Sequence, residues 1–388
     1  MLSLGWGLRG YIGGGPLGAM IPGALVAMSL CLLLRRGDSL TAAYGAIGIG
    51  FGGQMTYGQT IGLALKPDTM VWGLTGLTLK GAIWGLLGGA MVALGLTAGR
   101  YARRDVVAAF ACMVAATWAG WKLLNEPKLI YFSNRLDRPR PEIWFGLLLG
   151  ALAFLAWLSW RGGARIPWRF AGVCALGGGF GFGLGGSIQI WGPMLDPKPY
   201  LGYWKCMELF FGFCFGVALG WCAWRHRDSL AGAEPEPGTR PASSLLAAAA
   251  IVMGGLYLAG HIPSRFGYTI LGAVLMAVAL YFRPAAWHIA ITMTYGAYSI
   301  DFLRARPAPD QTALWAGVAL TTLAVGWCVA RRGQTLWLLL LLLWTAVGNS
   351  MLKSFAPPAD PGVQAWFMEA LFALMAAAST WMALRAAR

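Results

Sequence analysis

Long apolar runs follow one another along the whole chain, and they constrain its fold more than any other feature. A helix needs about 20 consecutive apolar residues to cross a bilayer. About thirteen runs approach or exceed that length, at residues 11–35, 40–63, 70–97, 105–124, 142–161, 168–193, 200–224, 244–261, 266–283, 285–303, 311–330, 335–355 and 362–385. Only 12% of the residues are charged, whereas a soluble domain averages about 25%. The sequence therefore predicts an all-α polytopic membrane protein.

Arginine clusters follow every second run, and segments rich in proline and aspartate follow most of the others. Examples are Arg35-Arg36 and Arg103-Arg104 on one side, and Lys66-Pro67-Asp68 and Pro357–Pro361 on the other. Because short basic loops stay on the cytoplasmic side, we expect the N-terminus outside and the C-terminus in the cytoplasm. The membrane would be the inner (cytoplasmic) membrane of a bacterial cell. The basic segment 125–142 is an exception, since this topology puts it outside.

The net charge of +15 does not indicate a nucleic-acid partner, because the cations sit in short clusters at the ends of apolar runs. Such clusters orient helices in the membrane. The seven cysteines lie inside apolar runs and form no Cys-x-x-Cys pair, and the three histidines are far apart. We therefore expect no metal site and no cofactor.

The longest polar segment, residues 228–243, is rich in proline, alanine and acidic residues. This composition is typical of a flexible linker. It separates an N-terminal membrane half at 1–227, with about seven runs, from a C-terminal half at 244–388 with about six.

The stretch 171–225 holds two glycine stripes with a four-residue spacing, which places each stripe on one helix face. Their members are Gly177, Gly181 and Gly185, then Gly212, Gly216 and Gly220. Such stripes let another helix backbone approach closely. Residues 45–100 resemble this stretch, with Lys80 aligned on Lys205, which suggests repeated helical hairpins. The alternative is that glycine-rich membrane helices resemble one another by composition.

The first run contains Gly13–Gly15, Pro16 and Pro22, so a regular helix is not expected through it. Broken helices occur in membranes where the backbone lines a cavity. The free N–H groups of a half-helix starting near Pro16 could hold an anion beside Arg9. The alternative is a kinked helix that packs tightly through glycine.

Under this topology the polar side chains inside the runs gather in the outer half of the membrane. The candidate binding residues are Arg9, Gln59, Lys80, Gln189, Lys205, Glu208, Asn349 and Glu369. Charged groups inside membranes mark a cavity, a pair or a pathway. Lys205 and Glu208 are three residues apart and can neutralise each other, and the glutamines can simply bridge helices. Lys80 is the strongest candidate, because it needs either a partner from another helix or an anionic ligand.

These features favour a transporter or permease for a small polar or anionic solute, with a polar cavity in the outer half of the membrane. One alternative is a membrane-embedded transferase that acts on a lipid-linked substrate from the outer face. Another is a non-catalytic membrane protein that binds a ligand or lipid. The sequence contains no motif that assigns catalytic residues. For a transporter, the expected partners are the lipid bilayer and the solute.

Overall fold

The computed structural model describes residues 1–134, 140–197, 199–230, 266–304, 311–355 and 362–388. Over these residues the chain forms helices and no strand. Nine of the helices in this part of the chain are long and apolar enough to cross a membrane. The expectation of an all-α membrane protein is therefore confirmed.

Every apolar run within the described residues corresponds to one or more helices. The elements are α1 (Leu2–Ile12), α2 (Gly15–Leu33), α3 (Ser39–Gly52), α4 (Gly58–Ala64), α5 (Met70–Thr97), η1 (Ala98–Arg100), α6 (Arg103–Gly120), η2 (Trp121–Asn125), α7 (Trp144–Gly162), α8 (Arg165–Leu195), α9 (Tyr203–Arg225), α10 (Arg227–Leu230), α12 (Gly267–Tyr281), α13 (Arg283–Trp287), η3 (His288–Met293), α14 (Thr294–Arg304), α15 (Gln311–Arg331), α16 (Thr335–Phe355) and α17 (Val363–Ala386). The run 244–261 and most of the linker 228–243 lie outside the described residues, so thirteen spans remain a prediction.

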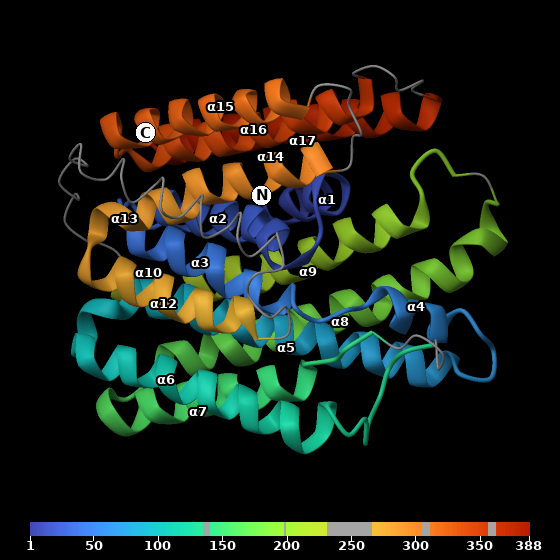
Figure 1. The fold of residues 1–388 in the computed structure, drawn as a ribbon, viewed down its shortest axis with the longest axis horizontal. Helices are drawn as coiled ribbons and strands as arrows, with labels where there is room; N and C mark the ends of the chain where they lie inside the picture. Colours follow the sequence, from blue (N-terminus) through green and yellow to red (C-terminus); the bar gives the residue numbers. More distant parts are fainter. Residues whose placement is uncertain (135–139, 198, 231–265, 305–310, 356–361) are drawn as a thin grey trace.

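The long helices run roughly side by side, and α10, α13 and the start of α6 lie at one end of the bundle (Figure 1). There Arg36 donates hydrogen bonds to the carbonyl oxygens of Leu96 and Leu230, at 3.0 and 2.8 Å. Arg100 donates to the carbonyl oxygen of Ser229 at 2.8 Å. We call this the arginine end. Which side of the membrane it faces stays a prediction.

His226 lies at the arginine end, just beyond α9, and its pKa is lowered there. Burial lowers the pKa of His226, and the charges of Arg169 and Arg225 lower it further.

The first helix folds back on the second, which the sequence analysis did not predict. A Cβ placed on Gly5 would lie 2.7 Å from the Cα of Pro22, whereas 17 residues of straight helix span about 25 Å. The helix ends at Ile12 and restarts at Gly15, whose φ of +68° favours glycine. Arg9, expected to precede the first helix, therefore lies within α1, and the N-terminus lies near the middle of the bundle (Figure 1).

A second break divides the run 40–63. Asp38 caps α3, accepting hydrogen bonds from the backbone N–H groups of Leu40 and Thr41 at 3.1 and 3.4 Å. The helix stops at Gly52, and α4 begins only at Gly58. The two breaks touch, because a Cβ on Gly53 would lie 2.6 Å from the carbonyl oxygen of Gly15.

The sequence predicted a close helix contact at the stripe of Gly177, Gly181 and Gly185, and the helix that packs there is α9. A Cβ on Gly177 would lie 2.7 Å from the Cβ of Ala218, and one on Gly185 would lie 2.9 Å from Met207. Glycine thus permits the close contact between α8 and α9. The second stripe differs along its length, since Gly212 packs on Ser3 of α1 while Gly220 has open space beside it. The internal duplication itself remains a prediction.

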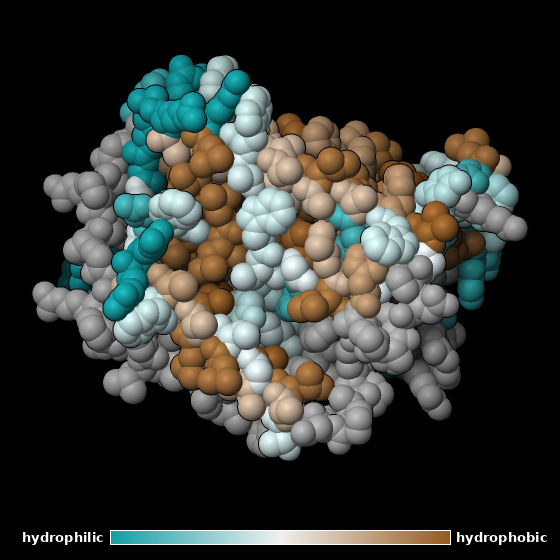
Figure 2. Space-filling view, turned by 90° about the horizontal axis from the view of Figure 1, so that it is seen from above, coloured by the Kyte–Doolittle hydropathy of each residue, from teal (hydrophilic) through white to brown (hydrophobic). Residues whose placement is uncertain are grey.

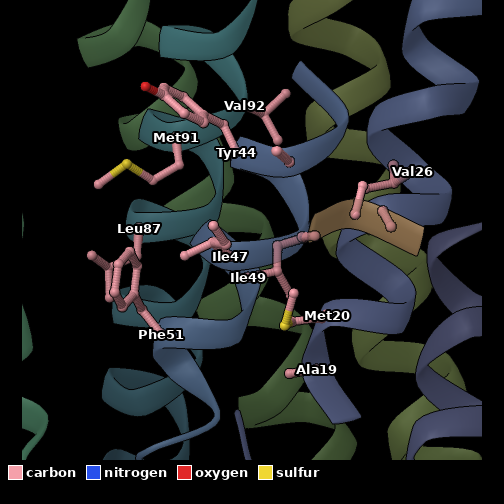
Figure 3. Close-up of a cluster of buried hydrophobic side chains, with 14 of the residues drawn as sticks. Ala19, Met20, Val26, Tyr44, Ile47, Ile49, Phe51, Leu87, Met91 and Val92 are labelled. Atoms are coloured by element: carbon pink, nitrogen blue, oxygen red, sulfur yellow. The ribbon is translucent and has the colours of Figure 1, made fainter. Parts of the chain in front are cut away.

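The core between α2, α3 and α5 is apolar and completely packed. Met20 and Val26 of α2 lie against side chains of α3 such as Ile49, with Leu87 and Met91 of α5 beyond them (Figure 3). On the face that Figure 2 shows, apolar residues lie between hydrophilic residues at the two ends. This distribution is the one that a bilayer requires.

The two expected halves pack against each other through described residues. Tyr44 of α3 donates a hydrogen bond to the carbonyl oxygen of Met276 in α12 at 3.1 Å. The hydroxyls of Tyr11 in α1 and Ser354 in α16 are 2.7 Å apart. The boundary at 228–243 stays a prediction.

Candidate functional site

Arg9 lies where the two helix breaks meet, and it is 3% exposed. Its Nη1 donates to the hydroxyl of Tyr57 at 3.2 Å, and its Nη2 donates to the carbonyl oxygen of Gly15 at 3.4 Å. Its Nε has no hydrogen-bond partner, and among the described residues no carboxylate pairs with it. A guanidinium carries five N–H donors, so this buried cation retains unused capacity.

Aromatic rings take the place of a counter-ion around Arg9. The guanidinium carbon lies 5.2 Å from the ring centroids of Trp6 and Trp84, and 5.8 Å from that of Tyr57. Cation–π contacts of this kind stabilise a desolvated charge by about 2 kcal/mol or more. Trp6 contributes a further unused donor, because its buried Nε1 also lacks a hydrogen-bond partner.

Tyr57 connects Arg9 to Glu208, because its hydroxyl accepts a hydrogen bond from Arg9 and donates one to Glu208. Oε1 of Glu208 accepts from the Tyr57 hydroxyl at 3.2 Å and from Nε1 of Trp204 at 3.1 Å, and Oε2 of the same residue is 2.5 Å from Nζ of Lys205. Lys205 also donates to the carbonyl oxygen of Gly7 at 2.9 Å. The sequence had left open that Lys205 and Glu208 pair with each other, and they do.

Tyr57 and Trp204 cover this site from the end opposite the arginines. Their rings stack with centroids 5.6 Å apart. Trp204 is 40% exposed and Tyr57 is half-buried. The buried charges therefore lie beneath two aromatic side chains, one of which is at the surface.

The polar chain continues from α1 to the C-terminal helices. The Tyr11 hydroxyl contacts Ser354, whose hydroxyl donates to Oε1 of Glu369 at 2.7 Å. Ser350 donates to the same oxygen at 2.8 Å, while the buried Oε2 of Glu369 has no partner. Lys353 donates to the carbonyl oxygen of Tyr11. Arg9, Lys205, Glu208 and Glu369 are thus linked around α1, and we call this group the Arg9 cluster.

Lys80 belongs to a different group, the Lys80 cluster, on the other side of residues 56–60. Its Nζ donates to Oε1 of Glu142 at 2.7 Å, to the Thr60 hydroxyl at 2.8 Å and to the carbonyl oxygen of Thr56 at 2.7 Å. The other oxygen of Glu142 accepts from the backbone N–H of Phe132 at 3.1 Å. Lys80 thus has a partner from outside its own helix, which is the structural alternative to an anionic ligand.

Three candidates remain, Gln59, Asn349 and Gln189, and within the described residues none of them binds a charged side chain of the Arg9 cluster or the Lys80 cluster. Gln59 accepts from the Ser133 hydroxyl and, at 3.0 Å, from the backbone N–H of Arg140, so it fastens the segment before α7 beside Lys80. Asn349 donates to the Ser299 hydroxyl at 3.4 Å and bridges α16 to α14. The buried Nε2 of Gln189 in α8 has no hydrogen-bond partner among the described residues.

Sequence reasoning missed Tyr57, Trp6, Trp84 and Glu142. Tyr57 follows Gly52-Gly53 inside an apolar run, and a tyrosine beside a possible helix break could have been marked. Trp6 and Trp84 look like the other tryptophans of the chain, so nothing local distinguishes them. Glu142 is the first residue of the apolar run 142–161, and it comes close to Lys80 only in the folded protein.

No group of three or more metal-ligating side chains comes together within the described residues. Comparison with protein-family models, with curated proteins and with solved structures finds no match to this chain. The chain is a helical membrane protein in which two broken helices meet around a buried arginine.

Proposed function

We propose that the chain is a transporter or permease for a small anionic solute and that Arg9 binds the solute. The observation that carries the proposal is a pair of buried donors without acceptors. Within the described part of the chain, Nε of Arg9 and Nε1 of Trp6 both lack a hydrogen-bond partner, and the guanidinium carbon lies 5.2 Å from the Trp6 ring centroid. A buried donor left unpaired costs about 1–3 kcal/mol, and more where it is charged. An anion supplies the acceptors that both groups lack.

The start of α2 adds a further reason to expect a negative ligand. The first N–H groups of a helix have no partner within it, and they carry a partial positive charge. No side chain caps α2, whose first residue, Gly15, contacts Arg9 through its carbonyl oxygen. An anion beside Arg9 would therefore lie close to the positive end of a helix.

Two interrupted helices that meet at buried charges support transport rather than simple binding. Transporters place their sites at discontinuous helices, and alternate opening moves one group of helices against another. Here α1 is a half-length helix that is followed by glycines, and Glu208 lies directly against its Gly10. We expect entry past Trp204 and Tyr57, followed by displacement of α1 relative to α9. The proposed location is the inner (cytoplasmic) membrane, with this entry side outward.

Uptake into proteoliposomes tests the proposal. Radiolabelled phosphate, sulfate, acetate and succinate are presented to vesicles holding the wild-type protein, Arg9→Met, Arg9→Lys or the control Arg104→Gln. Arg104 is exposed at the arginine end. We expect uptake of at least one anion by the wild type and the control, little by Arg9→Met, and reduced uptake by Arg9→Lys. Equal uptake by Arg9→Met contradicts the assignment of Arg9.

Two other outcomes would point to the alternatives. Saturable binding of an anion that depends on Arg9, with no accumulation inside the vesicles, would favour a non-catalytic binding protein. Turnover of a lipid-linked substrate without uptake would favour the transferase.

A further inference from the structure

Two adjoining cavities lie at the arginine end, away from the Arg9 cluster. The first, about 320 Å³, is almost entirely apolar and lies between the start of α1, the second half of α2, α9 and the end of α17. The second, about 580 Å³, is lined by the last turn of α2 and the residues after it, by the start of α16 and the residues before it, and by the end of α17 and the chain after it. Leu32 and Ala386 line both, so the two cavities are neighbours. Their volumes fall in the range of small-molecule sites.

The second cavity is basic and contains unused donors. As far as the structure describes it, the lining includes Arg35, Arg36 and Arg388 and contains no aspartate or glutamate side chain. Nε of Arg36 is buried and has no hydrogen-bond partner among the described residues, although its other nitrogens bind Asp38 and two carbonyl oxygens. The hydroxyl of Thr335, a residue only 6% exposed, also lacks a partner.

We propose that these two cavities bind one anionic glycerophospholipid, with an acyl chain in the apolar cavity and the phosphate in the basic one. The shape of the site requires a molecule that is apolar at one end and negatively charged at the other. Arginine is suited to phosphate because its planar donors match the phosphate oxygens. The apolar cavity lies beside the first residues of α1, so a bound acyl chain would occupy the space between that half-helix and the arginine end.

Three variants separate the two parts of this site. Arg35→Asn combined with Arg388→Gln removes two charges, and asparagine tolerates the positive φ of 52° at position 35. Gly220→Leu fills the apolar cavity, and a Cβ there meets nothing within 4 Å. Arg104→Gln is the matched control, since Arg104 is an exposed arginine at the same end that lines neither cavity.

The experiment measures phospholipid affinity of delipidated protein in detergent from the thermal shift on titration with phosphatidylglycerol, phosphatidylcholine or inorganic phosphate. We expect phosphatidylglycerol to bind most tightly. The double arginine variant should bind phosphatidylglycerol about tenfold or more weakly. Gly220→Leu should lower the affinity for phosphatidylglycerol and for phosphatidylcholine. Arg104→Gln should leave both affinities unchanged.

Wild-type protein alone provides a second measurement that does not depend on how the variants fold. Dihexanoyl phosphatidylglycerol should bind more weakly than the dioleoyl lipid, because its short chains fill less of the apolar cavity. Equal affinity for the two lipids overturns the proposal. So does a shift with inorganic phosphate that matches the lipid, or an equal loss in Arg104→Gln and the double variant.

Discussion

Two buried cations lie on either side of the short segment between α3 and α4, and they differ in how completely the protein satisfies them. Lys80 donates three hydrogen bonds, at 2.7–2.8 Å, and one of these acceptors is the carboxylate of Glu142. Arg9 donates two, at 3.2 and 3.4 Å, and leaves its Nε unused. An ammonium has three donors, so Lys80 is saturated and Arg9 is not.

This difference separates a structural ion pair from a candidate binding site. A saturated, buried pair resists change, because removing one member leaves the other charge buried alone. An unsaturated cation among aromatic faces can remain charged in the empty site and gain acceptors when an anion enters. The sequence pointed to Lys80 as the strongest ligand-binding candidate, but Lys80 is paired with Glu142, and we propose Arg9 for that role instead.

The largest effect on stability should come from Lys80→Met. It leaves Glu142 buried without a cation, so we expect a loss of about 3–5 kcal/mol. Denaturation in detergent measures it. The double variant Lys80→Met with Glu142→Leu should recover much of that loss, since neither charge remains. If the single variant is as stable as the wild type, Lys80 and Glu142 do not form the structural pair described above.

The next largest effect should be on anion binding and uptake in Arg9→Met. Hydrogen bonds to charged groups contribute about 1.5–3 kcal/mol, which corresponds to a loss of affinity of about 10- to 150-fold. Stability should fall less than in Lys80→Met, because Arg9 makes fewer bonds and leaves no carboxylate unpaired. A reversed order, with Arg9→Met unfolding and Lys80→Met losing only uptake, would exchange the roles of the two cations.

A smaller effect is expected for Tyr57→Phe, which removes the hydroxyl between Arg9 and Glu208. Glu208 keeps the donors from Lys205 and Trp204, so the fold should be retained. The Tyr57 hydroxyl holds the guanidinium of Arg9 in place, so without it we expect a less well positioned Arg9 and an affinity for the anion that falls by about tenfold. Trp204→Phe is the matched control, because it removes a donor to Glu208 and leaves Arg9 with all its partners. Equal losses in the two variants would mean that Tyr57 acts on Glu208 alone.

The smallest effect should come from Glu369→Gln. Its Oε1 accepts only serine hydroxyls and its Oε2 has no partner, so an amide can keep both hydrogen bonds. We expect a change of about 1 kcal/mol or less, measured by the same denaturation. Glu142→Gln should cost several times more, since Lys80 then loses its counter-charge. An equal loss of stability in Glu369→Gln and Glu142→Gln would show that a paired cation does not make Glu142 more important for stability than Glu369.

Local sequence was sufficient for the features that depend on one helix. The apolar runs predicted the helices, and the stripe at Gly177, Gly181 and Gly185 predicted a close helix contact that α9 provides. The glycines after Ile12 argued against a regular helix, because consecutive glycines and a proline disfavour one, but they left open a broken or a kinked helix, and the structure has the break. In each case the signal and its consequence lie within a few turns of the same helix.

The direction of α1 and the partner of Lys80 could not be predicted in this way. Residues 2–12 are too few to span a bilayer, so hydropathy gave no reason to expect a helix there. Whether the chain continues straight or folds back after Gly13 depends on the packing of Gly5 on Pro22. Glu142 is far from Lys80 in the chain, and their contact exists only because the segment before α7 packs over α4 and α5.

The most direct test of the central claim is the position of the anion in a density map of the protein with the solute that the uptake assay identifies. The account predicts density within hydrogen-bonding distance of Nε of Arg9, between Trp6 and the start of α2, with Lys80 still bound to Glu142. Density beside Lys80, or a protein carboxylate paired with Arg9 in place of the anion, would contradict it.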